Sequence, residues 1–321
     1  MPDQIVDRSP DAALPPWTNR GVLVYGPRKS GTTLFLNLLD GSDEMVAYPG
    51  ELKVKYLRRM SWGDDAKETY CRASHVPRMP SGCLDLEMYS RLWAAIPARS
   101  VSGNLSKLMR LDIWNVFQAA PVKARAPRMW CAKDVGGHTD AIIELWRRCF
   151  DEHRILFIVR SPLIVTRAVL QDRRRKGIRL AWTQIVSEAA KPLRVMAAQH
   201  RHIDDEDVFT ICYEDLVART TSTMRAVAWF LGIPYTTTFE FPSSFGRPVV
   251  VTTASKQVEE VFRDNHHWSE GLTLREKVLV GLTSLVTRAH PRYRLNYRRL
   301  RRDIRKRLER WSLKSDVAGV S

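Results

Sequence analysis

The fold is decided by Val22-Leu23-Val24-Tyr25-Gly26-Pro27-Arg28-Lys29-Ser30-Gly31-Thr32-Thr33. Residues 22–25 are apolar and predict a buried strand. Gly26 and Gly31 enclose four residues, which is the spacing of a loop whose backbone N–H groups and following helix N-terminus converge on an oxyanion. Apolar side chains then recur on one helical face up to Leu39. The stretch therefore predicts a strand, a phosphate-binding loop and a helix, in that order.

The position of the lysine separates this loop from those of nucleotide hydrolases. A Walker A loop has Lys and then Ser or Thr directly after its second glycine, but here Thr32 occupies that lysine position and Lys29 lies inside the loop. This displacement argues against an ordinary ATPase or GTPase. A P-loop small-molecule kinase that uses ATP and magnesium remains the alternative enzyme.

Further apolar strands alternate with amphipathic helices along the chain. Strands are predicted at residues 129–133, 155–159 and 208–212, each followed by a helical pattern. Such alternation is typical of an α/β, P-loop NTPase-like three-layer fold, with a central parallel sheet covered by helices on both faces. Ligands are then expected at the carboxyl ends of the strands.

The loop resembles the 5'-phosphosulfate loop of the sulfotransferases that use 3'-phosphoadenosine 5'-phosphosulfate (PAPS). The motifs are most similar to those of bacterial members and of the tyrosylprotein and carbohydrate branch, and the resemblance runs from about Gly21 to about Trp268. It implies that the chain transfers sulfonate from PAPS without a metal ion. It also implies that the 5'-phosphate side of the donor is bound by Arg28, Lys29, Ser30, Gly31, Thr32 and Thr33.

Three later segments extend the resemblance to the 3'-phosphate side of the donor. Arg160 begins the Arg160-Ser161-Pro162 element and would hold the 3'-phosphate. Tyr213 opens a Tyr-Glu-Asp-Leu element, and residues 252–258 resemble a loop that closes over the nucleotide, with Ser255 and Lys256 as donor contacts. One family position differs, because Ala168 replaces a serine. Substitute donors on the same helix are Arg167, Gln171 or Arg174.

Three residues are candidates for the chemical step. Lys29 can follow the charge that develops on the leaving oxygen, and Lys133 resembles a lysine that the family places near the transferred group. Glu51 lies within one residue of a catalytic glutamate in the family and is the candidate base for the acceptor hydroxyl. His75 and His138 remain alternatives, because other sulfotransferases use a histidine.

The formal charge of +16 is concentrated near the C-terminus. Residues 288–314 carry twelve Lys or Arg against two acids. Within this segment, an apolar stripe is formed by Tyr293, Tyr297, Leu300, Ile304, Leu308 and Trp311. Such a helix can lie on an anionic membrane or dock on its own domain, and both options stay open. Nucleic acid is not the favoured partner, although a basic membrane- or nucleic-acid-binding module without catalysis is the alternative of another class.

These observations divide the chain into an extended lead-in at residues 1–20, a catalytic domain at 21–287 and a basic amphipathic tail at 288–321. Five scattered cysteines, with neither a signal sequence nor a transmembrane segment, predict a cytoplasmic protein, which the tail would bring to the inner membrane face. The predicted acceptor is a hydroxyl of a carbohydrate, a glycolipid or lipid-linked glycan, or another small molecule.

Overall fold

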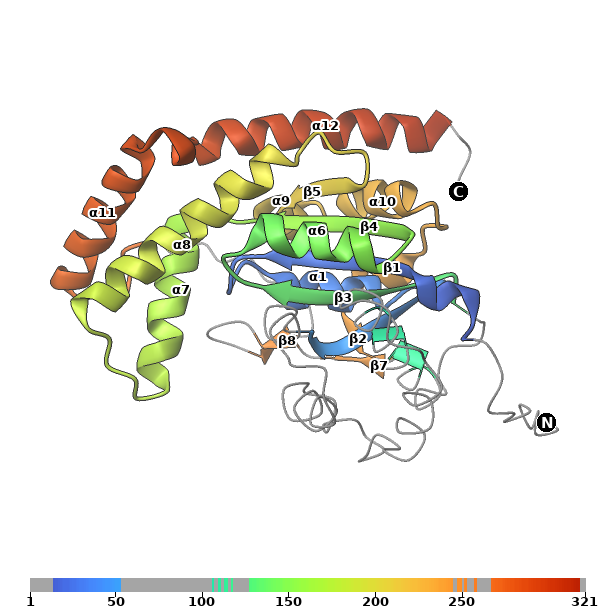
Figure 1. Ribbon diagram of the computed structural model, residues 1–321, viewed down its shortest axis with the longest axis horizontal. Helices are drawn as coiled ribbons and strands as arrows, with labels where there is room; N and C mark the ends of the chain where they lie inside the picture. The colour runs from blue at the N-terminus through green and yellow to red at the C-terminus, as the bar shows by residue number, and fades with distance from the viewer. Residues whose placement is uncertain are drawn as a thin grey trace.

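The computed structural model describes residues 14–52, 127–244, 247–249, 251–252, 257–258 and 267–317, with six further positions between 106 and 117. Within these residues, a five-stranded parallel sheet has the order β2-β3-β1-β4-β5. Its strands are β1 (Arg20–Gly26), β2 (Met45–Glu51), β3 (Met129–Val135), β4 (Glu152–Val159) and β5 (Val208–Cys212) (Figure 1). The predicted parallel sheet is confirmed, and the strand that leads into the glycine loop lies at its centre.

Helices connect the strands and extend the chain beyond them. They are α1 (Thr32–Leu39), α6 (Thr139–Cys149), α7 (Pro162–Arg175), α8 (Trp182–Arg201), α9 (Tyr213–Ala218), α10 (Thr220–Leu231), α11 (Leu274–Ala289) and α12 (Tyr297–Val317). The short 3₁₀ helices are η1 (Pro16–Asn19), η3 (Thr237–Glu240) and η4 (Pro291–Tyr293). Two antiparallel pairs join β6 (Ser243–Ser244) to β7 (Arg247–Pro248) and β8 (Val251–Thr252) to β9 (Gln257–Val258). No helix in the described ranges is long and apolar enough to cross a membrane.

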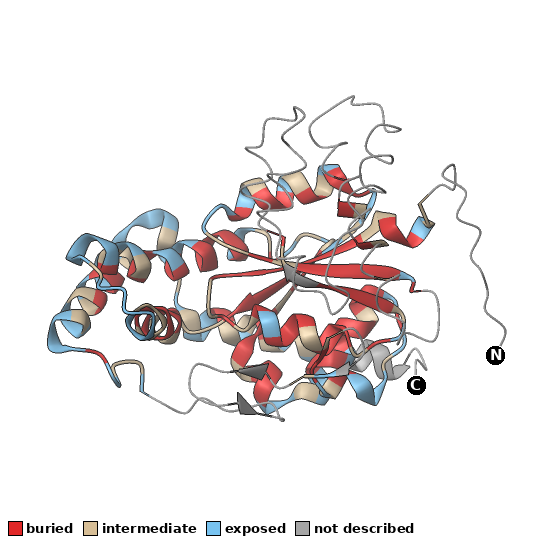
Figure 2. Ribbon diagram, turned by 90° about the horizontal axis from the view of Figure 1, so that it is seen from below, coloured by how far each residue is buried: buried red, intermediate tan, exposed pale blue. Residues whose placement is uncertain are grey.

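Helices cover both faces of the sheet. Leu23 and Tyr25 of β1 pack into one core cluster with residues of α6. Val22 and Val24 pack into a second cluster with residues of α1 and α10. The division arises because successive side chains of a strand point to opposite faces. Figure 2 shows the buried strands between the two helical layers, so the predicted three-layer α/β fold is confirmed.

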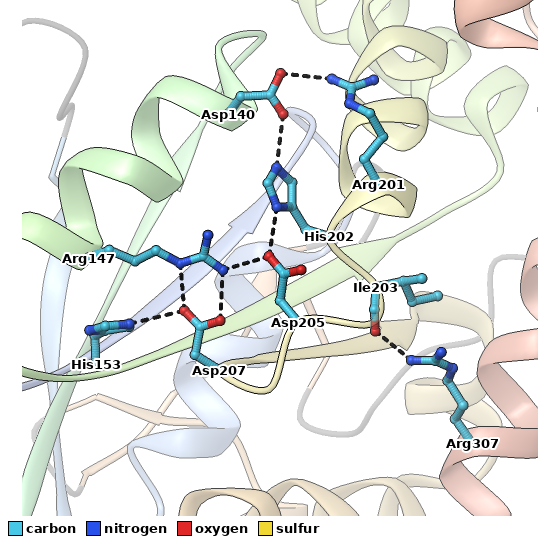
Figure 3. A network of polar contacts seen from close by, with 9 residues as sticks. All are labelled: Asp140, Arg147, His153, Arg201, His202, Ile203, Asp205, Asp207 and Arg307. Carbon is cyan, nitrogen blue, oxygen red and sulfur yellow. Dashed lines mark hydrogen bonds and ion pairs between the residues drawn. The ribbon is translucent and has the colours of Figure 1, made fainter.

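An ion-pair network fastens α6 and the end of α8 to the turn before β5 (Figure 3). Arg147 donates hydrogen bonds of 2.8 and 2.7 Å to Asp207 and one of 2.6 Å to Asp205. His153 Nε2 lies 3.1 Å from Asp207, and His202 Nδ1 lies 2.8 Å from Asp205. Burial alone would raise the pKa of both carboxyls, but Arg147, together with His202 at Asp205 and His153 at Asp207, outweighs it and holds both pKa values below their usual range. The network thus stabilises the amino end of β5.

The basic helix α12 packs on the body of the protein. Leu300 and Ile304 from the predicted stripe are buried in a cluster with residues of β4, β5 and α8. Trp311, further along the stripe, packs edge-on against Phe209 and Phe230. Of the two options that the sequence leaves open for this stripe, the structure therefore has the docked one.

Charge pairing reinforces the docking of α12. Asp215 of α9 is buried, and it accepts hydrogen bonds from Arg301 at 2.9 Å and from Arg305 at 2.7 Å. Tyr297 donates a hydrogen bond to Glu214. The preceding helix, α11, runs across residue 287, where the sequence analysis places the boundary between catalytic domain and tail.

Candidate active site

The loop between β1 and α1 is tightly wound at the carboxyl edge of the sheet. An added Cβ at Gly26 would lie 2.6 Å from Ser30 Oγ and 2.7 Å from the Ile158 carbonyl oxygen. At Gly31, φ is +103° and an added Cβ would lie 2.3 Å from the Tyr213 ring. Both positions therefore require glycine. Lys29 itself adopts a left-handed conformation, with φ of 66°.

The loop leads directly into the first turn of α1. The Phe35 N–H donates to the Gly31 carbonyl oxygen at 3.0 Å, which starts the helix. Ser30 and Thr32 are buried, and Thr33 is exposed in the first turn. The N–H groups at the start of a helix lack partners within that helix and favour an anion. The loop has the geometry predicted for a phosphate-binding turn.

Asp172 of α7 holds the two cations of the loop. Its carboxylate accepts a hydrogen bond of 2.9 Å from Arg28 and another of 2.9 Å from Lys29. Lys176 adds a third contact at 3.1 Å. Burial would raise the pKa of Asp172, but the hydrogen bonds from Lys29 and Lys176 outweigh it and lower that pKa. The sequence analysis missed this residue, because no local pattern links position 172 to a loop 143 residues earlier.

Arg160 and Tyr213 also lie against the loop. Arg160 directly follows β4, and its guanidinium donates to the Lys29 carbonyl oxygen at 3.0 Å. The same guanidinium lies over the Tyr213 ring, 4.0 Å from the ring centroid. Behind them, the Ser161 N–H donates to Glu214 at 3.3 Å, which fixes the turn that carries Arg160. The structure therefore brings Arg160 and Tyr213 to the loop at which the sequence predicts their function.

Lys133 and Glu51 form a second polar group at the same edge. Glu51 ends β2 and pairs in register with Lys133 of β3. Lys133 donates a hydrogen bond of 2.5 Å to Thr33 at the start of α1. Burial lowers the pKa of Lys133, and the negative charge of Glu51 partly opposes that shift. Of the three candidates for the chemical step, Lys133 thus contacts the first turn of α1, and Glu51 lies beside Lys133.

The remaining predicted residues are not all at this site. Ser255, Lys256 and His75 lie outside the described residues. His138 is exposed just before α6. The three substitutes for the missing serine contact the segment after residue 266: Arg167 donates to the His267 carbonyl, Gln171 to the Glu270 carbonyl and Arg174 to the Gly271 carbonyl. Among the described residues, no three His, Cys, Asp or Glu side chains are grouped so that they could hold a metal ion.

Comparison with known families agrees with this geometry. The model of the sulfotransferase family matches residues 21–237, which include the glycine loop, residues of all five strands of the parallel sheet and the helices α9 and α10. The chain belongs to the sulfotransferase family. The predicted family and enzyme class are confirmed. No curated protein matches the chain.

Three of the solved structures that are similar to this chain are sulfotransferases or sulfotransferase domains. The sulfotransferase domain from the curacin biosynthetic pathway is 15% identical, with a TM-score of 0.49 and coverage of 82% of this chain and 96% of that one. The domain from the Synechococcus PCC 7002 olefin synthase is 14% identical, with a TM-score of 0.47 and coverage of 82% and 94%. Mouse sulfotransferase SULT7A1, complexed with PAP, is 11% identical, with a TM-score of 0.45 and coverage of 91% and 89%. At these values the assignment rests on the family model.

Proposed function

We propose that this sulfotransferase transfers sulfonate from PAPS to a hydroxyl group by in-line displacement. The observation that carries the proposal is the grouping of three elements along one sheet edge: the Lys29 loop, Arg160 stacked on Tyr213, and the Glu51–Lys133 pair. The first can bind the 5'-phosphosulfate, the second a 3'-phosphate and the third the acceptor hydroxyl. An enzyme of this class needs all three in one place.

The donor is held by the loop and by Arg160. The N–H groups from Ser30 to Thr33 are expected to surround the 5'-phosphate, because they follow the glycine turn into α1. Arg160 supplies a planar guanidinium whose stacking on Tyr213 restricts its orientation, which suits a forked contact with a 3'-phosphate. Ser255 and Lys256 remain predicted contacts on the same side of the nucleotide.

The reaction breaks the bond between sulfur and the bridging phosphate oxygen while the acceptor oxygen bonds to sulfur. Glu51 takes the hydroxyl proton, and adenosine 3',5'-bisphosphate leaves with the electron pair of the broken bond. Lys29 stabilises the charge on that leaving oxygen once it exchanges Asp172 for the donor. Lys133 stabilises the peripheral sulfonate oxygens, since it lies beside the first turn of α1.

The acceptor that we propose is a hydroxyl of a carbohydrate, a glycolipid or lipid-linked glycan, or another small molecule, as the family resemblance implies. A cytoplasmic location is proposed because Cys131, Cys149 and Cys212 are buried free thiols, which suits a reducing compartment. Attachment to an anionic membrane through α12 would use its arginine face, since its apolar stripe is buried.

Calorimetric titration with adenosine 3',5'-bisphosphate and with ADP, each with and without magnesium, tests this function. The first ligand should bind more tightly, because it alone has a 3'-phosphate for Arg160. Arg160→Ala should weaken its binding by roughly ten- to a hundredfold and remove the preference over ADP. Lys29→Ala should lower turnover much more than donor affinity.

The matched control is Arg154→Ala, which removes an exposed arginine from the amino-terminal half of β4, the strand that precedes Arg160. It should leave both affinities unchanged. Equal affinity of the wild type for the two nucleotides, or a strict magnesium requirement, would replace the sulfotransferase mechanism with that of a P-loop kinase.

A further inference from the structure

The helix α11 carries an apolar face that is turned to solvent. Eight large apolar side chains are exposed among the described residues, and five of them lie on this helix. These five form the α11 stripe: Leu274, Val278, Leu282, Leu285 and Val286. Their spacing by four, four, three and one residues puts them on one side of an α-helix. They range from 50% to 79% exposed, so the stripe is an open surface rather than the rim of the core.

The other side of α11 is firmly held. Val280 is fully buried in a cluster with Leu170 of α7 and with Ile185 and Ala189 of α8. Thr273 and Glu276 form a capping box at its start. Figure 1 shows α11 beside α8 at one end of the molecule. The stripe is therefore presented by a helix in a fixed place, whose other side is buried at Val280, Thr283 and Ser284.

Glu276 is further engaged by Arg174 of α7, which donates a hydrogen bond of 2.5 Å to its carboxylate. Since Glu276 is the only acidic residue of α11, the helix presents no other carboxylate.

Basic residues border the α11 stripe. Arg275 and Lys277 are exposed in its first turn. Beyond its last turn, the chain continues with exposed Arg292 and Arg294, which line a pocket together with His200 and other residues of α8. An apolar stripe with a basic border matches the boundary between acyl chains and anionic headgroups of a bilayer.

Charge decides between a lipid surface and a second copy of this chain. In an antiparallel pairing of two α11 helices, Arg275 and Lys277 of one copy would approach the region of Arg288 and Arg292 in the other. In a parallel pairing each basic residue would face its own counterpart. Neither arrangement brings an exposed acid of α11 to the contact, so like charges would oppose association. An anionic membrane instead complements both features, because its acyl chains suit the apolar stripe and its charged headgroups suit the basic border.

We propose that the α11 stripe and its basic border bind the surface of an anionic lipid membrane. The stripe would enter the boundary between headgroups and acyl chains, with Arg275 and Lys277 at the level of the lipid phosphates. This surface is separate from the buried stripe of α12 and from the candidate active site. Donor binding should therefore be independent of it.

The test uses co-sedimentation of the full chain with vesicles of phosphatidylglycerol and phosphatidylcholine in equal parts, and with vesicles of phosphatidylcholine alone. The wild type should partition to the anionic vesicles, and less so as salt increases. The double variant Leu282→Gln/Leu285→Gln should partition at least about tenfold less, because it removes two apolar side chains from the membrane contact. Phe241→Gln changes an exposed aromatic residue outside α11 and should partition like the wild type.

A second pair of variants tests the charge. Arg275→Gln/Lys277→Gln should reduce partitioning and flatten its salt dependence. Arg148→Gln/Arg219→Gln removes the same charge from exposed positions elsewhere and should change neither. Because all these side chains are exposed, melting temperatures and binding of adenosine 3',5'-bisphosphate should stay at wild-type values. That result separates a lipid defect from misfolding.

Three outcomes would overturn the proposal. The first is unchanged partitioning of the Leu282→Gln/Leu285→Gln variant. The second is equal, salt-independent binding of the wild type to neutral and anionic vesicles. The third is a dimer in sedimentation velocity that the leucine substitutions convert to a monomer, which would assign the stripe to a second copy of the chain.

Discussion

Gly31→Ala should distort the donor-binding loop, and Gly177→Ala provides its matched control. Both glycines adopt positive φ, +103° at Gly31 and +70° at Gly177. They differ in surroundings, because an added Cβ meets nothing within 4 Å at Gly177 but lies 2.3 Å from the Tyr213 ring at Gly31. The Tyr213 ring cannot move freely, since the Arg160 guanidinium stacks on it. The pair of variants therefore separates backbone strain from a steric clash.

The expected losses in the free energy of unfolding follow from the backbone strain and the steric clash. A left-handed conformation costs an alanine about 1–2 kcal/mol, and this should be the whole cost of Gly177→Ala. Overpacking against a fixed neighbour costs about 1–3 kcal/mol more. The free energy of unfolding of Gly31→Ala should therefore fall by about 2–5 kcal/mol. Since one kcal/mol shifts the melting temperature of a chain of 321 residues by about 1–2 °C, the two variants are distinguishable in a thermal scan.

Chemical denaturation measures the stability of both variants, and calorimetry measures their affinity for adenosine 3',5'-bisphosphate. Gly31→Ala should bind at least about tenfold more weakly, because the loop N–H groups shift with the backbone. Gly177→Ala should bind normally. In a double-mutant cycle, Tyr213→Ala should cost less in the Gly31→Ala background than in the wild type, since it removes the clash. Equal destabilisation by the two alanines, or a cycle without coupling, would refute the clash.

Three other expectations concern the base, the helix α12 and the response to pH. Glu51→Gln should leave donor affinity nearly unchanged and lower turnover by about two to four orders of magnitude. If Glu51→Gln keeps near-normal turnover while His138→Ala or His75→Ala is inactive, the base is a histidine. Arg301→Gln/Arg305→Gln should lower the free energy of unfolding by about 3 kcal/mol, because Asp215 would remain buried without its partners. The control Arg298→Gln/Arg299→Gln, on the exposed face of the same helix, should change the free energy of unfolding little. Ending the chain after Pro291 should accordingly reduce folded protein, and an intact domain with weaker vesicle binding would contradict this. Folding lowers the pKa of five carboxyls, those of Asp172, Asp205, Asp207, Asp215 and Glu276, so the unfolded chain binds more protons in acid. The stability from these groups is present above their unfolded pKa of about 4 and is lost as pH falls through their lower folded pKa values. Urea unfolding at a series of pH values would measure this loss.

The parts of the site that depend on local backbone could be predicted from the sequence. The spacing of Gly26 and Gly31 predicts the loop, because positive φ and close approach are properties of single positions. The strand pattern also predicts that Arg160 and Lys133 lie at one edge of the sheet, since each is at or next to the carboxyl end of an apolar strand, whereas their roles come from the family resemblance.

Contacts between distant segments could not be predicted in this way. Periodicity identifies the apolar face of a helix but not what covers it. The stripe of α12 is buried because β4, β5 and α8 cover it, and Asp215 pairs with Arg301 and Arg305, which lie 86 and 90 residues away in sequence. The stripe of α11 follows a similar period and is exposed. Only the positions of neighbouring elements distinguish the two helices.

The distribution of charge explains why two different surfaces of this protein should bind anions. The chain has 51 basic and 35 acidic residues. Asp172, Asp215 and Glu276 are all occupied by basic side chains of the same molecule. At the loop, the single carboxylate of Asp172 contacts Arg28, Lys29 and Lys176, so a net positive charge remains there for an anionic donor, and donor binding should weaken as salt increases. At α11, Arg275 and Lys277 are exposed without another acid on the helix, so binding there adds a new anion and should depend strongly on salt.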